Sequence, residues 1–254
     1  MQVSFDFSGS VVLVTGGTRG VGRGITDSFL ATGAAVVVCG RKEPEAGSLG
    51  GADFVACDVR DSEQVAALVE TIVARHGRLD VAVNNAGGSP PADSATASPR
   101  FSESIIRLNL LAAVYVSQAA YKVMHEQPGG GTIINICSVS GMRPTPQTAA
   151  YGAAKAGLLN LTQTLAMEWA PEVRVNAVTA GLVKTEQSHL FYGDEVGIAR
   201  VDATVPMGRM ADPRDVGDAC VFLASPAAAY ISGTNLMVHG GGERPPYIGA
   251  ASGQ

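Results

Sequence analysis

The sequence predicts an α/β protein built on a doubly wound parallel sheet of about seven strands, with helices on both faces. Two observations carry this prediction. Short β-branched apolar runs alternate along the chain with longer segments of helical periodicity. In addition, no linker, short repeat or shift in composition divides the 254 residues. We therefore expect a single domain over 1–254, with an irregular C-terminal tail over 243–254.

The first half begins with the apolar run Val11–Val14, which is typical of a buried parallel strand. A helix follows, because apolar residues recur at helical spacing from Val21 until Gly33 interrupts the pattern. The segment 61–63 is suited to cap a second helix over 64–76. The other strands expected in this half are 36–39, 53–56 and 79–83.

The same alternation continues through the second half. A long helix is expected over Phe101–Met124, and a helix rich in Ala and Leu over Tyr151–Trp169. The segment 182–206 has weak periodicity and mixed polarity, so we expect it to be mobile. The remaining expected elements are strands at 132–137, 173–178 and 235–238 and a short helix at 215–223.

Composition and charge exclude several classes of protein. Hydrophobic residues make up 46% of the chain, which excludes disorder for most of it. A net charge of -5 without a dense Lys/Arg cluster argues against nucleic-acid binding. The best membrane candidate, 108–121, is too short to span a bilayer, and no signal peptide is evident. The Cys and His residues are scattered, so we expect a reduced, cytoplasmic protein without a metal site.

A glycine-rich turn, Thr15–Gly22, lies between the first strand and the first helix. Glycine lets the backbone approach a ligand, and a helix N-terminus presents free N–H groups and the positive end of its dipole. This combination suits a pyrophosphate, so the turn predicts a nucleotide site. For this segment taken alone, an ordinary tight turn between strand and helix is the alternative.

Further motifs follow at fixed places. Asn84–Gly87 reads Asn-Asn-Ala-Gly, Ser138 precedes Tyr151 by 13 positions, and Tyr151 and Lys155 form a Tyr-x3-Lys pair. With the glycine-rich turn, this order resembles the short-chain dehydrogenase/reductase family in its compact single-domain branch. The resemblance runs from about Phe5 to Gly241. It implies a Rossmann-like fold and an oxidoreductase that transfers a hydride between a nicotinamide cofactor and a carbonyl or alcohol.

The resemblance also implies roles for particular residues. Tyr151 would be the general acid–base, Ser138 would orient the substrate carbonyl, and Lys155 would hold the nicotinamide ribose. Asn109, the fourth residue of the implied catalytic set, would hold a water that passes protons to Lys155. The residues that match the family's cofactor site are Gly16, Thr18, Arg19, Gly20, Val21, Gly22, Arg41, Asp58, Val59, Asn85, Ala86, Gly87, Tyr151, Lys155, Gly181, Val183 and Thr185.

Elementary chemistry agrees with these roles. Tyr151 and Lys155 are four positions apart, so they share one face of a helix. A nearby ammonium stabilises a phenolate, which brings a tyrosine closer to the range where acid–base catalysis is most effective. Ser138 follows an apolar run, and sheets of this type bind ligands at the carboxyl ends of their strands. Taken singly, each residue is more often a packing or surface residue, and Ser140 competes for the role of Ser138.

The turn after the second strand favours NADP (NADPH) over NAD. Gly40 stands where NAD-preferring relatives usually have an Asp that binds the ribose hydroxyl. Arg41 follows directly and Arg19 lies in the glycine-rich turn, and a guanidinium binds phosphate through paired hydrogen bonds. The alternative is that both arginines are surface residues.

Two positions depart from the family pattern. Ala180 stands in place of the usual Pro before Gly181, which removes a φ restraint beside the nicotinamide. His239 replaces an Asp, and we interpret it as a structural or interface residue. Segments 88–100 and 182–206 are expected to form the wall of a partly apolar substrate pocket. We also expect a homo-oligomer, a tetramer or dimer, that associates through the helices containing Asn109 and Tyr151.

Two other classes of function stay open. A nucleotide-binding or redox-sensing protein without turnover would not need an acid–base tyrosine. A sugar-nucleotide epimerase or dehydratase shares Tyr-x3-Lys but usually carries a larger C-terminal substrate region, and an enoyl-reducing relative has a longer Tyr–Lys spacing. The sequence therefore favours a small-molecule carbonyl or alcohol as the substrate, with no nucleic-acid or membrane partner.

Overall fold

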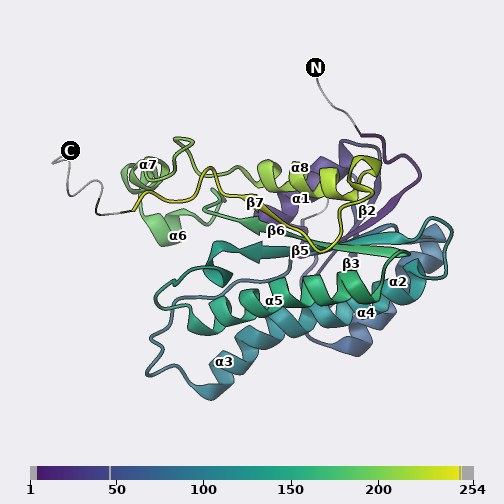
Figure 1. Ribbon diagram of the computed structural model, residues 1–254, viewed down its shortest axis with the longest axis horizontal. Coiled ribbons are helices and arrows are strands. Elements are labelled where there is room, and N and C mark those ends of the chain that lie inside the picture. The colour runs from purple at the N-terminus through teal and green to yellow at the C-terminus, as the bar shows by residue number, and fades with distance from the viewer. Residues whose placement is uncertain (1–4, 46, 246, 248–254) are drawn as a thin grey trace.

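A computed structural model describes residues 5–45, 47–245 and 247. Its seven parallel strands form one sheet in the order β3-β2-β1-β4-β5-β6-β7, which confirms the predicted fold class (Figure 1). The strands are β1 (Val11–Thr15), β2 (Ala35–Gly40), β3 (Asp53–Ala56), β4 (Val81–Asn84), β5 (Gly131–Ser138), β6 (Val173–Ala180) and β7 (Asn235–Val238).

Alternate residues of each central strand are buried on opposite faces of the sheet. In β1, Val11 and Leu13 belong to one core cluster, whereas Val12 and Val14 belong to the other. The first cluster is covered by α2 (Ser62–His76), α4 (Ala112–Met124) and α5 (Ala149–Glu168), and the second by α1 (Gly20–Leu30) and α8 (Pro213–Ala224), as Figure 1 shows. Burial on both faces explains why these strands are continuous apolar runs in the sequence.

The long helix expected over 101–124 is interrupted. It consists of α3 (Pro99–Ile106), a π-helical turn η1 (Arg107–Leu111) and α4, so the expectation of one regular helix is wrong. In the turn, the N–H of Ala112 bonds to the carbonyl of Arg107, five residues back. A single wide turn leaves the apolar periodicity on either side almost unchanged, so the sequence pattern does not register it.

The segment 182–206, expected to be mobile, contains two short helices, α6 (His189–Tyr192) and α7 (Glu195–Asp202). The Asp194 carboxylate caps α7 by accepting from the N–H of Gly197. The second helix of the chain, α2, begins two residues earlier than expected and is capped by Asp61. Likewise α8 begins at Pro213 behind an Asp212–Asp215 capping box.

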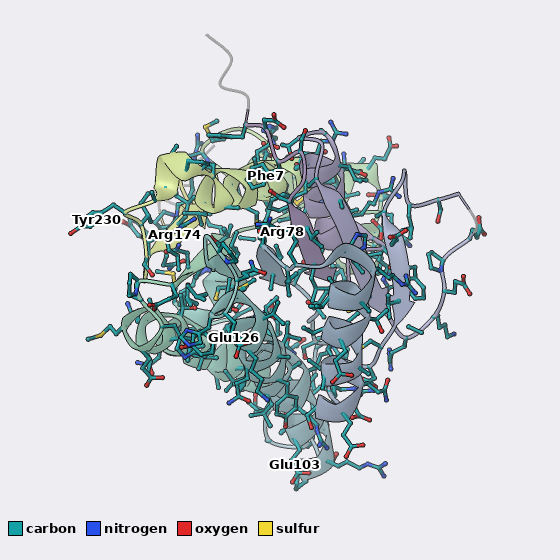
Figure 2. The ribbon with its side chains drawn as sticks, turned by 90° about the vertical axis from the view of Figure 1, so that its right-hand side faces the viewer. Phe7, Arg78, Glu103, Glu126, Arg174 and Tyr230 are labelled. Carbon is teal, nitrogen blue, oxygen red and sulfur yellow. The ribbon has the colours of Figure 1, made fainter. Side chains whose placement is uncertain are left out.

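The predicted irregular tail begins at Glu243, but residues 246 and 248–254 lie outside the described residues. The backbone up to that point is attached to the body, because the N–H of Arg244 donates to the carbonyl of Thr204. Three short 3-10 or wide turns complete the structure: η1, η2 (Val139–Gly141) and η3 (Pro226–Ala228). Tyr230, just after η3, projects from the surface (Figure 2).

The sheet order places a topological switch point between β1 and β4. From β1 the chain crosses to β2 and β3 on one side and then returns to β4 on the other. In open α/β sheets, ligands bind beside such a point, at the carboxyl ends of the strands. The end residues there include Thr15, Gly40, Asn84, Ser138 and Ala180.

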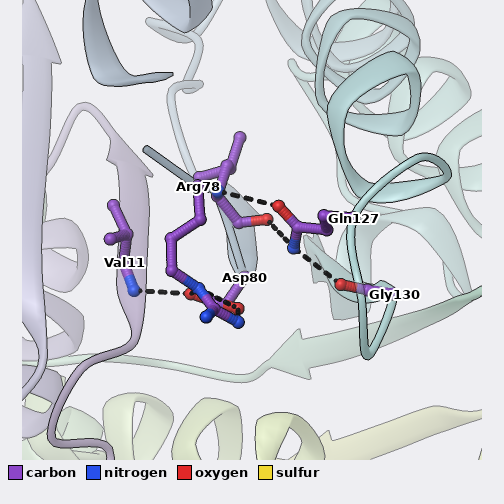
Figure 3. A network of polar contacts seen from close by, with 6 residues as sticks. Val11, Arg78, Asp80, Gln127 and Gly130 are labelled. Carbon is purple, nitrogen blue, oxygen red and sulfur yellow. Dashed lines mark hydrogen bonds and ion pairs between the residues drawn. The ribbon is translucent and has the colours of Figure 1, made fainter. Parts of the chain in front are cut away.

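The opposite edge, where the strands begin, is held by polar contacts (Figure 3). Asp80 accepts from the buried N–H of Val11 at 2.8 Å and forms an ion pair with Arg78. The amide of Gln127 donates to the carbonyls of Leu79 and Gly130 at 2.9 and 2.7 Å. These contacts fix the starts of β1 and β4 far from the carboxyl ends.

We expect Asp80→Ala to lower the free energy of unfolding by about 1–3 kcal/mol, because it leaves the N–H of Val11 buried without a partner. Urea unfolding measures this loss. Activity per folded molecule should be unchanged, since Asp80 lies at the edge opposite to the strand ends. The matched control is Glu126→Ala, an exposed position labelled in Figure 2, which should change the stability by less than about 0.5 kcal/mol.

Candidate active site

The glycine-rich turn between β1 and α1 leaves its backbone open to a ligand. Gly16 and Gly20 have φ of 64° and 53°, a conformation that favours glycine. At Gly22 a Cβ would lie 2.5 Å from the side-chain nitrogen of Asn85 and against the carbonyl of Gly16, so only glycine fits. Helix α1 has no side-chain cap and no acidic residue in its first turn. Its first N–H groups are therefore available to an anion.

A buried hydroxyl ties this turn to the loop after β4. The Thr15 side chain accepts from the N–H groups of Asn85 and Ala86 at 2.9 and 3.0 Å. In return, the amide of Asn85 donates to the carbonyl of Thr15 at 2.9 Å. These hydrogen bonds hold the two loops on either side of the switch point in one geometry.

Tyr151 and Lys155 lie on the first turns of α5, as their spacing predicts. The Lys155 ammonium is buried, donates to the carbonyl of Ile136 at 2.7 Å and lies 5.7 Å from the centre of the Tyr151 ring. Within the described residues, that carbonyl is its one hydrogen-bond partner. An ammonium has three donors, so two of them are free for a ligand or water.

Ser138 ends β5 and lines the same cleft as Tyr151 and Lys155. Its hydroxyl oxygen accepts from the N–H of Ser140 at 3.2 Å, which leaves the O–H free to donate. The competing residue, Ser140, does not line the cleft, and its hydroxyl accepts from Thr145 at 3.0 Å. The geometry therefore brings Ser138, and not Ser140, to the pair on α5.

Asn109 lies in the π-helical turn and is buried. Its amide donates to the carbonyls of Gly88 and Ile105, both at 2.9 Å, and its oxygen accepts from the N–H of Gly88 at 2.7 Å. The side chain thus fixes the loop after β4. A Cβ on Gly87 would lie 2.7 Å from this oxygen and 3.4 Å from the Lys155 nitrogen, so the loop passes close to both.

Asn109 and Lys155 also border a small internal cavity of about 10 Å³, together with Thr15 and Asn84. That volume is about the minimum for one water molecule, and these four polar residues line it together with apolar side chains. Asn109 does not line the large cleft itself.

The large cleft at the carboxyl ends has a volume of about 870 Å³, within the range of small-molecule sites. Every residue predicted to bind the cofactor lines it, and so do three of the four predicted catalytic residues. Residues that the sequence analysis missed also line it, among them Lys42, Arg60, Leu108, Ile136, Glu186 and Gln187. They adjoin the recognised motifs but carry no pattern of their own.

These residues fit a nicotinamide dinucleotide. The uncapped N-terminus of α1 and the glycine-rich turn suit a pyrophosphate, and the free donors of Lys155 suit ribose hydroxyls. The far end of the cleft is cationic: Arg19, Arg41 and Lys42 are exposed and, within the described residues, none is in an ion pair.

Asp58 and Arg60 form an ion pair at the same end of the cleft, with nitrogen–oxygen distances of 2.5 and 2.9 Å. The hydrogen bonds from Arg60 lower the pKa of Asp58, and Arg41 contributes to the same shift. Asp58 is therefore ionised at neutral pH, and it neutralises Arg60 rather than leaving it free for a phosphate.

The departure at Ala180 has a structural counterpart. Ala180 pairs with Val238 of β7, and the N–H of Gly181 donates to the carbonyl of Val238 at 2.9 Å. Pairing with β7 thus restrains the turn that Pro restrains in relatives. A Cβ on Gly181 would lie 2.7 Å from that of His239, so His239 packs directly behind the turn.

A second pocket of about 210 Å³ adjoins the cleft at Gly181. Only part of the two segments expected to form the substrate wall borders a cavity. From 182–206, Leu182 and Val205 line this pocket, whereas Leu190 and Phe191 are exposed. From 88–100, only Gly88 lines the large cleft. The other lining residues, not anticipated, are Val139, Met142, Arg143, Met237, His239, Gly242 and Glu243.

The four cysteines are free and buried, and three of them, Cys39, Cys57 and Cys137, line the cleft. Burial raises the pKa of the Cys137 thiol to about 11, so it is protonated and a poor nucleophile at neutral pH. In the described part of the chain, no three His, Cys, Asp or Glu side chains are grouped to hold a metal ion. Nor does that part contain a helix long and apolar enough to cross a membrane.

Comparison with known proteins agrees with this geometry. Residues 16–243 match a family model described as enoyl-(acyl carrier protein) reductase. The chain is 38% identical to L-fucose dehydrogenase of Oryctolagus cuniculus, over 93% of this chain and 86% of the relative. It is 36% identical to 3alpha-hydroxysteroid dehydrogenase of Mediterraneibacter gnavus, over 91% and 95%.

Among solved structures, the aldohexose dehydrogenase of Thermoplasma acidophilum in ligand-free form is similar, with a TM-score of 0.87 and 32% identity. The similarity covers 95% of this chain and 96% of that one. The protein belongs to the short-chain dehydrogenase/reductase family. It is an NAD(P)-dependent oxidoreductase that acts on alcohols.

Proposed function

We propose that the protein interconverts a carbonyl and an alcohol with NADP, with Tyr151 as general acid–base. One observation carries the proposal: Ser138, Tyr151 and Lys155 line the same cleft as the glycine-rich turn. A bound nicotinamide would supply or accept the hydride there. The residues of the chain have to orient the oxygen of the substrate and move its proton.

In the direction of reduction, Ser138 and Tyr151 both donate to the carbonyl oxygen. Ser138 has a free O–H, and this donor stabilises the negative charge that develops on the oxygen as hydride reaches carbon. Tyr151 transfers its phenolic proton to that oxygen and becomes a phenolate. The buried ammonium of Lys155, 5.7 Å from the ring centre, stabilises this phenolate.

The proton of Tyr151 is replaced through Lys155. The cavity below Lys155 has room for one water, and its walls include Asn109 and Thr15. Because the side chain of Asn109 is committed to Gly88 and Ile105, we assign it chiefly the positioning of the loop after β4. Asn109 contributes to proton transfer by forming part of the wall of the cavity that would hold the water.

Reduction of a carbon–carbon double bond is the competing reaction, since the matched family model is described as an enoyl reductase. The spacing of Tyr151 and Lys155 argues against it, because enoyl-reducing relatives carry a longer Tyr–Lys interval. Relatives named for L-fucose and for a hydroxysteroid act on alcohols by their names and support carbonyl–alcohol chemistry. Their substrates differ so much in size that the names alone indicate no particular compound.

NADP is the proposed cofactor because Gly40 offers no carboxylate to the adenosine ribose. Arg19 and Arg41, by contrast, are cations that line the cleft and form no ion pair among the described residues. Asp58 does not take the role of the missing acid, because Arg60 occupies its carboxylate.

We expect Arg41→Ala to weaken NADPH binding by about 10- to 100-fold, the effect of losing a charge-assisted bond to phosphate. NADH binding should change by less than about threefold. Parallel fluorescence titrations with the two dinucleotides measure both dissociation constants. Arg75→Ala is the matched control, because Arg75 is exposed on α2 and does not line the cleft. Tighter binding of NADH than NADPH by the wild type would contradict NADP as the cofactor.

We further propose a cytoplasmic homo-oligomer. Four free thiols suit a reducing compartment. Each of the two helices expected at an interface exposes a large apolar side chain, Leu111 at 38% and Met167 at 85%, and burying these side chains between copies would favour association.

A further inference from the structure

The second pocket adjoins the cofactor cleft and offers space for the part of a substrate that lies beyond its reacting carbon. It meets the cofactor cleft at Gly181, and Val139, which follows Ser138, forms part of its wall. Four segments surround it: the turn after β5, the turn after β6, the chain after α7 at Val205, and the chain from β7 to Glu243. Its volume of about 210 Å³ is below the usual range for drug-sized ligands, which suits a compact substrate.

The walls of this pocket combine apolar side chains with an opposite-charge pair. Leu182, Val205 and Met237 supply apolar surface. Arg143 and Glu243 form an ion pair across the pocket, although they are 100 positions apart in the chain. Both side chains are about one-third exposed, at 39% and 33%, so each keeps atoms available to a ligand.

Hydrogen bonds hold the guanidinium of Arg143 on the side of the pocket nearest to Ser138. The guanidinium donates to the hydroxyl of Thr145 at 2.9 Å, and Thr145 donates to Ser140 at 3.0 Å. Ser140 in turn donates its N–H to the hydroxyl oxygen of Ser138. The ion pair is therefore connected to Ser138 through a short series of hydrogen bonds and holds a defined position relative to it.

Further polar groups lie near Glu243. His239 lines the pocket, and Tyr192 lies near Glu243 without being one of the lining residues. Burial, with a smaller contribution from Glu243, raises the pKa of Tyr192. The donors of the Arg143 guanidinium and the acceptors of the Glu243 carboxylate both face the pocket, with no formal charge left over from the pair.

We propose that the Arg143–Glu243 pair determines specificity for a neutral polyhydroxylated substrate, a small sugar or polyol. The inference rests on the proposed function, because it needs the reacting carbon at Tyr151. Paired hydroxyls match the alternating acceptors and donors of a carboxylate and a guanidinium, and the C–H faces of a sugar pack on the apolar wall. A substrate that carries a carboxylate would be repelled by Glu243, which also occupies the arginine.

The test compares neutral polyols and aldoses of about four to six carbons with the matching sugar acids. For the wild type, kcat/KM should be at least about tenfold higher for the neutral compounds, the effect of one charged hydrogen bond. E243Q should lower kcat/KM for the best neutral compound by about tenfold, through KM, and raise it for the matching acid, because Arg143 is then free. The double variant Arg143→Gln/Glu243→Gln should lose the gain for the acid.

A reversal of the substrate preference indicates a role in specificity. A purely structural role would change kcat/KM for the neutral compounds and for the acids in the same direction. Glu126→Gln is the control for a lost surface carboxylate and should leave both values within about twofold. Wild-type preference for acids, or an equal loss for both classes in E243Q, would overturn the inference. Reduction of diacetyl with NADPH separates this failure from that of the proposed function, because diacetyl has a carbonyl but no hydroxyl.

Discussion

Tyr151→Phe is expected to lower kcat by about a thousandfold, within the range of general acid–base catalysis, while the dissociation constant for NADPH changes by less than about threefold. The substitution removes one oxygen and leaves the ring and the fold of α5 in place. It deprives the substrate oxygen of its proton donor, so the loss should fall on the chemical step and not on cofactor binding. Diacetyl reduction under saturating NADPH measures kcat, and fluorescence titration measures binding.

Tyr230→Phe is the matched control for this substitution, because Tyr230 is fully exposed and does not line the cleft. It should keep full activity. A Tyr151→Phe variant that retained more than about a tenth of the wild-type kcat would exclude Tyr151 as the main proton donor. The proton would then have to come from Ser138 or from solvent.

Gly22→Ala is expected to weaken binding of NADPH and NADH alike by about a hundredfold, about the loss of one to two charge-assisted hydrogen bonds to the pyrophosphate. The added Cβ would lie 2.5 Å from the side-chain nitrogen of Asn85 and against the carbonyl of Gly16. Either the first turn of α1 or the loop after β4 must then move, and both lie at the expected pyrophosphate. The loss should be independent of the 2′-phosphate, unlike that in Arg41→Ala.

Gly47→Ala controls for the general effect of replacing glycine. Gly47 has a φ of 76°, and among the described residues no atom lies within 4 Å of a Cβ built on it, so its substitution costs stability without touching the cleft. Its dinucleotide affinity should equal that of the wild type. If Gly22→Ala, folded by circular dichroism, bound NADPH as tightly as the wild type, the pyrophosphate would not lie at the start of α1.

The strands could be predicted well because the sheet is buried on both faces. A run such as Val11–Val14 must be apolar throughout when alternate residues enter two different cores. Helix starts were less accurate, since α8 begins with a capping box of Asp212 and Asp215 around Pro213, before the apolar helical periodicity sets in. The π-helical turn around Asn109 could not be predicted, because the apolar periodicity is nearly the same before and after it.

The lining of the cleft could be predicted where it is formed by short sequence motifs, at Thr15–Gly22 and at Tyr151–Lys155. The second pocket was anticipated only in part, at Leu182 and Val205, because its walls come from four segments that lie far apart in the sequence. Arg143 and Glu243 have no sequence signal, since an ion pair over 100 positions depends on tertiary packing alone. His239, interpreted as a structural or interface residue, proves to line this pocket as well as to pack behind Gly181.

The most direct test of the account follows the hydride itself. We would give the wild-type protein cyclohexenone, which offers both a carbonyl and a conjugated double bond, together with NADPH deuterated at its transferable position. Mass spectrometry and NMR of the product then locate the label. Hydride transfer to the carbonyl predicts deuterium on the carbon that bears the new hydroxyl, with the double bond retained. Deuterium at the β-carbon of a saturated ketone would contradict the account and identify an enoyl reductase instead.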